Sequence, residues 1–94
     1  MAEQDEVTNN SAESRYELAA GGAVAIAAYR VEEDAVVFTH TEVPQALEGQ
    51  GVGSRLVRGA LADVRLRGLK ARPLCPFVAG YIERHPETRD LLEG

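Results

Sequence analysis

The sequence has one cysteine, Cys75, no tryptophan and few aromatic side chains, which make up 5% of its residues. A single cysteine excludes an internal disulfide and a metal site built from several thiolates. Because aromatic side chains are scarce, aliphatic side chains must fill most of the core. The 94 residues are therefore expected to form one domain with a modest core.

Long apolar runs and a surplus of basic charge are also missing. No stretch approaches the roughly 20 apolar residues that a helix needs to cross a bilayer, and the acidic N-terminus lacks the features of a secretory signal. The formal net charge of −5 argues against a nucleic-acid partner, because phosphate contacts need clustered lysine and arginine. Two isolated histidines and one cysteine predict no metal site. We expect a cytoplasmic protein without a membrane or nucleic-acid partner, and the sequence leaves its oligomeric state open.

Residues 1–13 and residues 14–94 differ in composition. The first segment contains Val7 as its only large apolar side chain apart from the initiator methionine. Such a segment cannot bury enough apolar surface to offset the entropy that it would lose on ordering. The sequence therefore predicts a disordered tail over residues 1–13 and a folded domain over residues 14–94.

The first half of the domain has the two-residue period and the turn residues of β-structure. Gly21-Gly22 and an acidic segment that begins at Glu32 separate three β-rich runs. Pro44 ends the third run, because proline cannot donate to a β-ladder. The sequence predicts an antiparallel three-stranded meander over residues 14–20, 23–31 and 35–43.

The hydrophobic period then changes to 3.6 residues. Six apolar residues recur on one face: Val52, Leu56, Val57, Ala60, Leu61 and Val64. They predict an amphipathic helix of about 15 residues that ends near Gly68. A fourth strand over residues 69–75 contains Pro73, which favours a sheet edge or a bulge, and Pro76 begins a second helix that ends at His85. The expected class is α+β with the order β-β-β-α-β-α, and the fourth strand should run parallel to the third.

The segment from residue 42 to residue 56 carries the strongest chemical signal. It leads from a strand through a glycine-rich loop into the predicted helix, whose first N–H groups and positive dipole end favour an anion such as pyrophosphate. The glycines remove Cβ atoms where a ligand would approach, although glycines at a helix start can also form a plain turn. Ser54 would add a hydroxyl, and Arg55 or Arg58 a positive charge. The glycines concerned are Gly49, Gly51 and Gly53.

The position of the loop excludes two well-known phosphate motifs. The glycines follow a meander rather than the first strand of a βαβ unit, and no Lys-Ser or Lys-Thr pair is present. Residues 48–53, EGQGVG, resemble the acetyl-CoA pyrophosphate loop of the GCN5-related N-acetyltransferases, Gln/Arg-x-x-Gly-x-Gly/Ala, except that Glu48 occupies the first position. The chain is most similar to a short branch of this family over about residues 15–92. The other matching segments are residues 40–44, 73–78, 81–82 and 85–87.

The resemblance implies a compact acetyltransferase fold in which the fourth strand splays away from the third. It also implies acetyl-CoA as the cofactor and an amine of a small molecule or a protein as the acetyl acceptor. The pantetheine arm would lie between the splayed strands, held by backbone groups near Thr41 and Val43, with the thioester close to Cys75. The loop would supply the remaining cofactor contacts, from Gln50, Gly51, Val52, Gly53, Ser54 and Arg55.

Two polar side chains on the third strand are candidate bases. Acetyl transfer needs a neutral amine and a stabilised oxyanion, and a backbone N–H near Val43 would serve the oxyanion. Strict strand alternation places His40 and Glu42 on the face that carries Val36 and Phe38. Either side chain would then act as the base, and a surface or structural role is the alternative.

Two further side chains are candidates for the thioester end of the reaction. Tyr81 is similar to a tyrosine that protonates the leaving thiolate in related enzymes, and the alternative is a core aromatic ring stacked on Phe77. Cys75 offers a covalent acyl-cysteine route, favoured by the start of the second helix behind it. The alternative for Cys75 is a small buried apolar residue.

Three functions fit these features. The first is an acetyl-CoA-dependent N-acetyltransferase, and the second is a non-catalytic CoA-binding or acyl-CoA-binding module that acts through a protein partner. The third is a small interaction domain with a vestigial loop. Because the short branch lacks the segments that form the acceptor pocket in larger members of the family, the sequence does not identify the amine.

Overall fold

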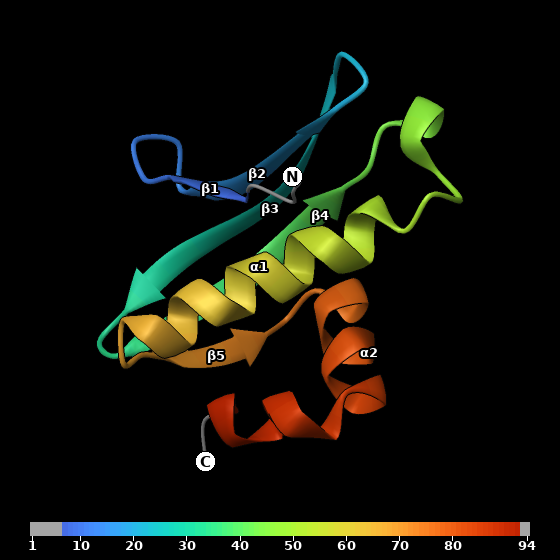
Figure 1. The fold of residues 1–94 in the computed structure, drawn as a ribbon. Coiled ribbons are helices and arrows are strands. Elements are labelled where there is room, and N and C mark those ends of the chain that lie inside the picture. Colours follow the sequence, from blue (N-terminus) through green and yellow to red (C-terminus); the bar gives the residue numbers. More distant parts are fainter. Residues whose placement is uncertain (1–6, 93–94) are drawn as a thin grey trace.

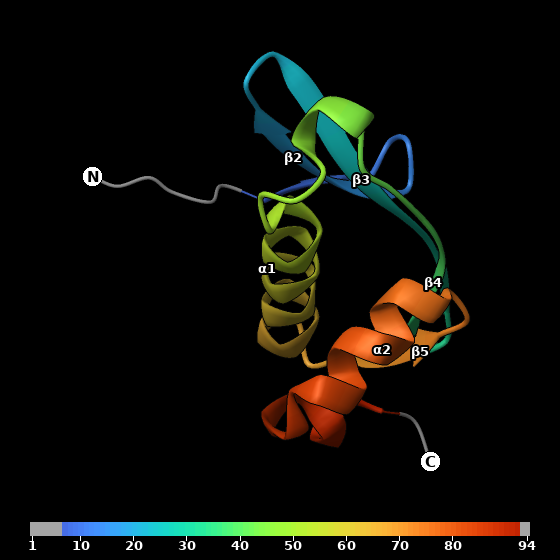
Figure 2. The ribbon, with the colours of Figure 1, turned by 90° about the vertical axis from the view of Figure 1, so that its right-hand side faces the viewer.

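In the part of the chain that the structure describes, five strands form one sheet and two α-helices pack on one side of it (Figures 1 and 2). The computed structural model describes residues 7–92. The strands lie in chain order across the sheet, so β5 forms one edge. They are β1 (Thr8–Asn10), β2 (Arg15–Ala20), β3 (Ala23–Glu32), β4 (Ala35–Glu42) and β5 (Lys70–Pro73). The helices are α1 (Val52–Leu66) and α2 (Pro76–Arg84), with short 3₁₀ helices η1 (Gln45–Leu47) and η2 (Pro86–Leu91).

The predicted α+β class and order of elements are confirmed. Strands β2, β3 and β4 pair antiparallel, and β5 pairs parallel to β4 from Ala35↔Lys70 to Phe38↔Pro73. The prediction that Pro73 marks a sheet edge is also confirmed, since β4 is the only strand that pairs with β5 within residues 7–92. An isolated parallel bridge joins Ala71 to Leu92 on the outer side of β5.

The first helix begins and ends as its sequence predicts. All six apolar residues of its predicted face are buried. At its end Gly68 has a φ of 72°, and two backbone hydrogen bonds of 3.0 Å close the last turn, from Gly68 to Arg65 and from Leu69 to Val64. This pair is a Schellman motif, and it needs the left-handed conformation that glycine adopts without strain.

The core lies between one face of the sheet and the two helices. Tyr16 and Leu18 of β2, Tyr29 of β3 and Phe38 of β4 all point into it. The hydroxyl of Tyr16 donates a 2.7 Å hydrogen bond to Asp63, which attaches α1 to the sheet. The opposite face of the sheet carries no helix within residues 7–92, so it stays open along β2, β3 and the end of β4 (Figure 2).

The N-terminal boundary differs from its prediction. Strand β1 pairs antiparallel with β2 in the register Thr8↔Glu17, so the expectation of a disordered tail is wrong for residues 8–10. Val7 packs at Gly59 of α1, where a Cβ would lie only 2.4 Å from the valine side chain. This polar segment becomes ordered without a core of its own because the edge of β2 offers backbone hydrogen-bonding partners. Residues 1–6 lie outside the described residues, so the tail stays a prediction there.

Strand β4 contains a β-bulge at Thr39. Tyr29 of β3 pairs with Phe38, but the preceding Ala28 pairs with His40, which leaves Thr39 as an extra residue in β4. One extra residue reverses the alternation of every side chain after it. Thr41 pairs with a core-facing residue of β3, whereas His40 faces the open side. The prediction that His40 and Glu42 share a face with Val36 and Phe38 is therefore wrong.

Candidate functional site

A hollow of about 250 Å³ lies where the glycine loop enters α1. The loop leaves β4 at Val43, turns through η1 and reaches the helix through three glycines. The lining comprises three glycines and four apolar residues, with one hydroxyl and one carboxylate. The lining residues are Val43, Leu47, Glu48, Gly49, Gly51, Val52, Gly53, Ser54 and Phe77.

The start of α1 offers backbone donors to this hollow. Gly51 is the N-cap residue in the left-handed conformation, with a φ of 73°, and it has no side chain that caps the helix. The first backbone hydrogen bond of the helix runs from Arg55 to Gly51. The amides of Val52, Gly53 and Ser54 precede it and receive no side-chain cap, so they are donors with a positive dipole end behind them. Such a helix start favours an anion.

The three glycines of the loop have two different roles. Gly49 and Gly51 have positive φ values of 83° and 73°, and a Cβ on either would meet no atom within 4 Å. Their left-handed backbone conformation favours glycine, and the space beside them stays open. Gly53 has no positive φ, but a Cβ there would lie 2.6 Å from the ring of Phe77 and 3.3 Å from Val43. Gly53 therefore lets α2 approach the first turn of α1, a packing role that the sequence did not indicate.

The structure brings five of the predicted cofactor residues together at the hollow: Val43, Gly51, Val52, Gly53 and Ser54. Gln50 points elsewhere, because its side-chain amide donates to the carbonyl of Ala46 at 3.2 Å. Arg55 is not among the residues that line the hollow. Phe77 is a lining residue that sequence reasoning assigned only to the apolar face of α2, since a contact with Gly53 has no local signal.

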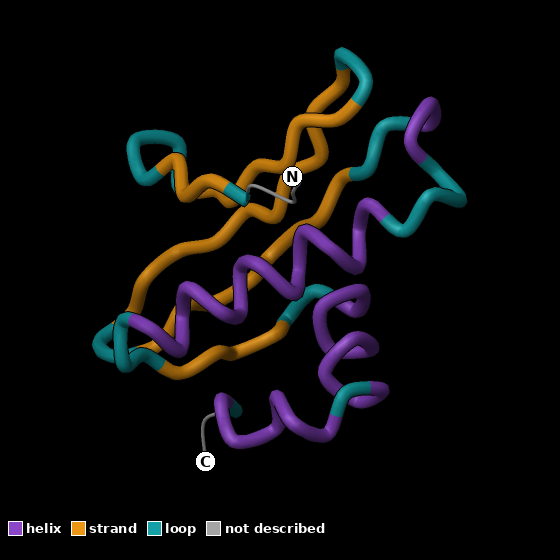
Figure 3. The backbone as a smooth tube through the Cα atoms, in the orientation of Figure 1, coloured by secondary structure: helices purple, strands orange, loops and turns teal. Residues whose placement is uncertain are grey.

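The predicted splay between β4 and β5 begins at Phe38. The amides of Leu74 and Cys75 both donate to the Phe38 carbonyl at 3.0 Å, so the chain turns away from β4 at this point. Beyond it, the second half of β4 and the start of α2 diverge (Figure 3). The 3.2 Å hydrogen bond between the Thr41 hydroxyl and the Cys75 thiol spans the gap.

Cys75 is a buried thiol at the N-terminus of α2. Burial raises the pKa of this thiol, but hydrogen bonding from the Thr41 hydroxyl and from the amides of Val78, Phe77 and Thr41 outweighs it, so the pKa lies below the ordinary value. The Cys75 side chain makes no capping hydrogen bond with α2. The lowered pKa therefore results from these nearby donors acting together. The arrangement stabilises a thiolate.

Removing the Thr41 hydroxyl should raise the pKa of Cys75. Thr41→Val keeps the shape of the side chain but removes the hydroxyl donor. Burial, which raises the pKa of Cys75, is then offset by fewer hydrogen bonds, so a higher pH is needed to ionise the thiol. Because the chain has one cysteine, the thiolate absorbance followed against pH reports this group alone. Thr39→Val is the matched control, since the Thr39 hydroxyl bonds the carbonyl of Ala28 instead. Equal midpoints for Thr41→Val and the wild type would contradict the role of the hydroxyl.

Tyr81 lies apart from the glycine loop, in the cleft between α1, α2 and η2. Its buried ring stacks on His85 with a centroid separation of 3.9 Å and an interplanar angle of 15°. His85, rather than the Phe77 that the alternative named, is thus its stacking partner. Tyr81 lines a hollow of about 190 Å³ together with Arg58 and Leu61. Burial raises the pKa of Tyr81 more than the positive charge of Arg58 lowers it, so the phenol keeps its proton at neutral pH.

His40 and Glu42 form a pair on the open face of the sheet. The His40 Nε2 atom lies 3.0 Å from the Glu42 carboxylate. The structure therefore brings these two candidate bases together. They lie on one face of β4, and the side chain of Thr41 lies on the other.

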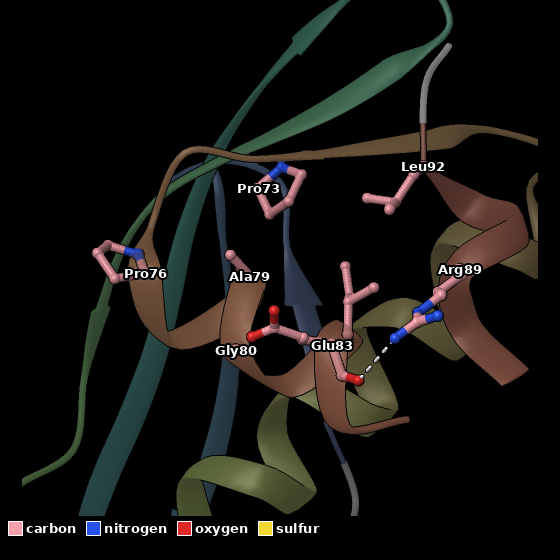
Figure 4. Close-up of a pocket in the computed structure, with 8 residues that line it drawn as sticks. Pro73, Pro76, Ala79, Gly80, Glu83, Arg89 and Leu92 are labelled. Atoms are coloured by element: carbon pink, nitrogen blue, oxygen red, sulfur yellow. Dashed lines mark hydrogen bonds between the residues drawn. The ribbon is translucent and has the colours of Figure 1, made fainter. Parts of the chain in front are cut away.

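A separate hollow of about 550 Å³ lies on the outer side of α2 (Figure 4). Its lining is largely apolar, and it shares no residue with the hollow at the glycine loop. Arg89 closes one end by donating to the carbonyl of Glu83 at 3.1 Å. The α2 residues that line this hollow recur at helical spacing and lie on the side of the helix away from α1. The hollow is therefore not part of the glycine-loop site. The lining residues are Pro73, Pro76, Ala79, Gly80, Ile82, Glu83, Arg89 and Leu92.

No group of three or more histidine, cysteine, aspartate or glutamate side chains within residues 7–92 has a geometry that would hold a metal ion. None of the helices in this range combines the length and the apolar character needed to span a bilayer.

The fold is α+β, β5 separates from β4 at one edge of the sheet, and a glycine loop beside this point leads into a helix start without a side-chain cap. These features define the acetyltransferase class of fold that the sequence resembles. The family model for GCN5-related N-acetyl-transferases matches residues 15–91. The chain belongs to this family.

Individual relatives agree with the family match. The solution structure of a GCN5-like protein from Staphylococcus aureus superimposes with a TM-score of 0.72 at 27% identity, covering 95% of this chain and 88% of that one. The protein NATD1 of Xenopus tropicalis is 34% identical over 56 residues, which are 60% of this chain and 51% of NATD1. Human NATD1 is 37% identical over 51 residues, 54% of this chain and 45% of NATD1. The matched part thus spans about half the length of the NATD1 proteins.

Proposed function

We propose that this protein binds acetyl-CoA at the glycine loop and transfers the acetyl group to an amine. The observation that carries the proposal is the start of α1, where three amides without a side-chain cap border an open hollow beside a left-handed glycine. A diphosphate matches this arrangement because its oxygens accept several N–H bonds at once and its charge is favoured by the helix dipole. The carboxylate of Glu48 at the rim opposes that charge, so we expect binding weaker than a glutamine or arginine would allow.

The rest of the cofactor would follow β4. From the hollow, a pantetheine arm reaches Val43 and then Thr41, where β4 has lost its parallel partner. Backbone groups of β4 would bond the arm as an added strand would, and the arm would displace the contact between Thr41 and Cys75. The thioester then lies beside the thiol and the start of α2.

Two routes lead from this geometry to the product. In direct transfer the neutral amine attacks the thioester carbon and a backbone N–H near Val43 stabilises the oxyanion. The amine nitrogen gives up a proton to His40, Glu42 or solvent, and the protonated phenol of Tyr81 or solvent supplies a proton to the leaving thiolate. In the covalent route Cys75 attacks first and passes the acetyl group to the amine, which its lowered pKa favours.

Calorimetric titration with acetyl-CoA and with free CoA tests the proposal. We expect both ligands to bind with similar affinity, because the diphosphate is common to them. The intact mass of the protein after incubation with acetyl-CoA distinguishes the routes, since only the covalent route leaves an acetyl group on Cys75. If neither ligand bound at millimolar concentration, the proposal would fail. Tight binding with no product from a panel of amines would support a non-catalytic CoA-binding module instead.

A further inference from the structure

The hollow of about 550 Å³ on the outer side of α2 has no part in the proposed transfer (Figure 4). We propose that this hollow is a second binding site, for a small zwitterion that carries an ammonium and a carboxylate at opposite ends of an apolar body. The site is independent of the proposed function, because it uses neither the cofactor nor the acetyl acceptor. It is defined by apolar walls, by two charges without ion pairs and by a glycine that the packing of the helix does not require.

The size and the walls of the hollow are those of a small-molecule site. Pockets for small ligands usually measure about 300–1,000 Å³ and are lined mainly by apolar groups. Pro73 at the end of β5 and Pro76 at the start of α2 contribute rigid rings, and Leu92 adds an aliphatic side chain that is 38% exposed. Because the proline rings are already fixed, they lose little conformational entropy when a ligand packs against them. The walls therefore suit an apolar ligand body.

The two charged residues of the lining lie at opposite ends of the hollow. The side chain of Glu83 extends toward Ala79 and Gly80, whereas the guanidinium of Arg89 lies at the other end (Figure 4). Arg89 is held there by its hydrogen bond to the backbone carbonyl of Glu83, which does not engage the Glu83 carboxylate. Among the residues that the structure describes, no ion pair includes either charge. A ligand with an ammonium at one end and a carboxylate at the other would complement both.

Gly80 lies in the middle of α2 and lines the same hollow. Glycine within a helix is less favourable than alanine, so its presence calls for a reason. Its φ is not positive, and a Cβ there would meet only the flexible end of Arg84, at 3.3 Å. Gly53 and Gly59 of α1 differ, because neighbouring side chains occupy the space that their Cβ atoms would need. The missing side chain of Gly80 therefore serves no packing, and it keeps the hollow open beside the Glu83 carboxylate.

The connection between β5 and α2 separates this hollow from the position proposed for the thioester. Pro73 and Pro76 line the hollow, but Cys75 between them does not, and its thiol contacts Thr41 instead. The hollow also shares no residue with the hollow at the glycine loop. A zwitterion bound on the outer side of α2 is therefore a ligand other than the cofactor and the acetyl acceptor.

Three probes with the same chain length test the two charges separately. At neutral pH 6-aminohexanoate carries both charges, hexylamine only the positive one and hexanoate only the negative one. Amide chemical shifts of the isotope-labelled full chain, followed during titration at constant ionic strength, report both the affinity and the place of binding. We expect 6-aminohexanoate to bind more tightly than either analogue, and the largest shifts to fall on residues around the hollow, such as Ala79, Gly80 and Leu92.

Substitution of either charge should change the order of the three affinities. Glu83→Gln should weaken binding of 6-aminohexanoate and hexylamine about 5- to 10-fold and leave hexanoate unchanged, because only the ammonium loses its partner. Arg89→Gln should weaken 6-aminohexanoate and hexanoate to a similar extent and leave hexylamine unchanged. Glu87→Gln is the matched control, since it makes the same change of net charge at a residue that does not line the hollow, and we expect wild-type affinities.

Gly80→Leu tests the hollow itself. Leucine is a strong helix former, so the variant should fold, and its side chain would fill the space beside the Glu83 carboxylate. We expect the affinity for 6-aminohexanoate to fall at least about 10-fold, which is the loss of one good charged contact. The site is overturned if 6-aminohexanoate does not bind at millimolar concentration, if the three probes bind the wild type equally, or if Glu87→Gln loses as much affinity as Glu83→Gln. Chemical shifts confined to residues away from the hollow would overturn it as well.

Discussion

Gly51→Glu should abolish acetyl-CoA binding while leaving a folded protein. A side chain at this N-cap would enter the space beside the first-turn amides, where nothing now lies within 4 Å of a Cβ, and its carboxylate would repel the diphosphate. Losing two hydrogen bonds to a charged group costs roughly 3–6 kcal/mol. Such a loss lowers affinity at least about 100-fold. Calorimetric titration with acetyl-CoA measures it directly.

The other end of the same helix provides a matched control. Gly68 has a φ of 72°, against 73° for Gly51, and a Cβ there also meets open space. Gly68→Glu therefore carries the same backbone strain, about 1 kcal/mol or slightly more, and adds an acid at the unfavourable end of the dipole. Thermal unfolding should show both variants destabilised, Gly68→Glu by more than Gly51→Glu, because an acid is favourable at the N-terminus of a helix and unfavourable at its C-terminus. If Gly68→Glu lost acetyl-CoA binding as fully as Gly51→Glu, backbone strain rather than the anion site would explain the effect.

Local sequence signals predicted strands β2 to β5 and both α-helices, because each of these elements depends on neighbours in the chain. The four-residue spacing of apolar side chains in α1, the stop at Gly68 and the start of α2 at Pro76 are all short-range features. The parallel pairing of β4 with β5 follows from the helix between them, because a crossover connection joins parallel strands. These features needed no knowledge of distant contacts.

The bulge at Thr39 could not be predicted from the residues that form it. Thr39 is β-branched and fits a regular strand as well as a bulged one, so composition gives no mark of the extra residue. Strict alternation then assigns every later side chain to the wrong face. The consequence for the site is large, because Thr41 rather than His40 meets Cys75.

Contacts between distant segments were equally invisible in the sequence. Strand β1 is ordered by the edge of β2 and by the hydroxyl of Tyr29, which donates to Asn9 at 2.5 Å. Tyr81 found its stacking partner one turn later in the chain rather than one turn earlier. In each case the sequence identifies a group that is able to interact, but the partner is determined by tertiary packing.

Gly53→Ala should destabilise the protein, although alanine favours a helix. The substitution gains about 0.5–1 kcal/mol of helix propensity. Against this gain, the new methyl would lie 2.6 Å from the ring of Phe77 and 3.3 Å from Val43. Overpacking of this kind costs about 1–3 kcal/mol, so the clash should win. Denaturant unfolding should give a lower free energy of unfolding, by about 1–2 kcal/mol.

Gly80→Ala is the control that isolates helix propensity from packing. A Cβ at this position in α2 meets only the flexible end of Arg84, at 3.3 Å, so the same substitution should stabilise by about 0.5–1 kcal/mol. Combining Gly53→Ala with Phe77→Leu should recover most of the loss, because the shorter side chain vacates the space. A cycle of the two single variants and the double variant measures this coupling. Additive effects of the two substitutions would show that Gly53 does not hold α2 against the glycine loop. Strong coupling would establish that the third glycine serves packing and that it lets the ring of Phe77 line the hollow at the glycine loop.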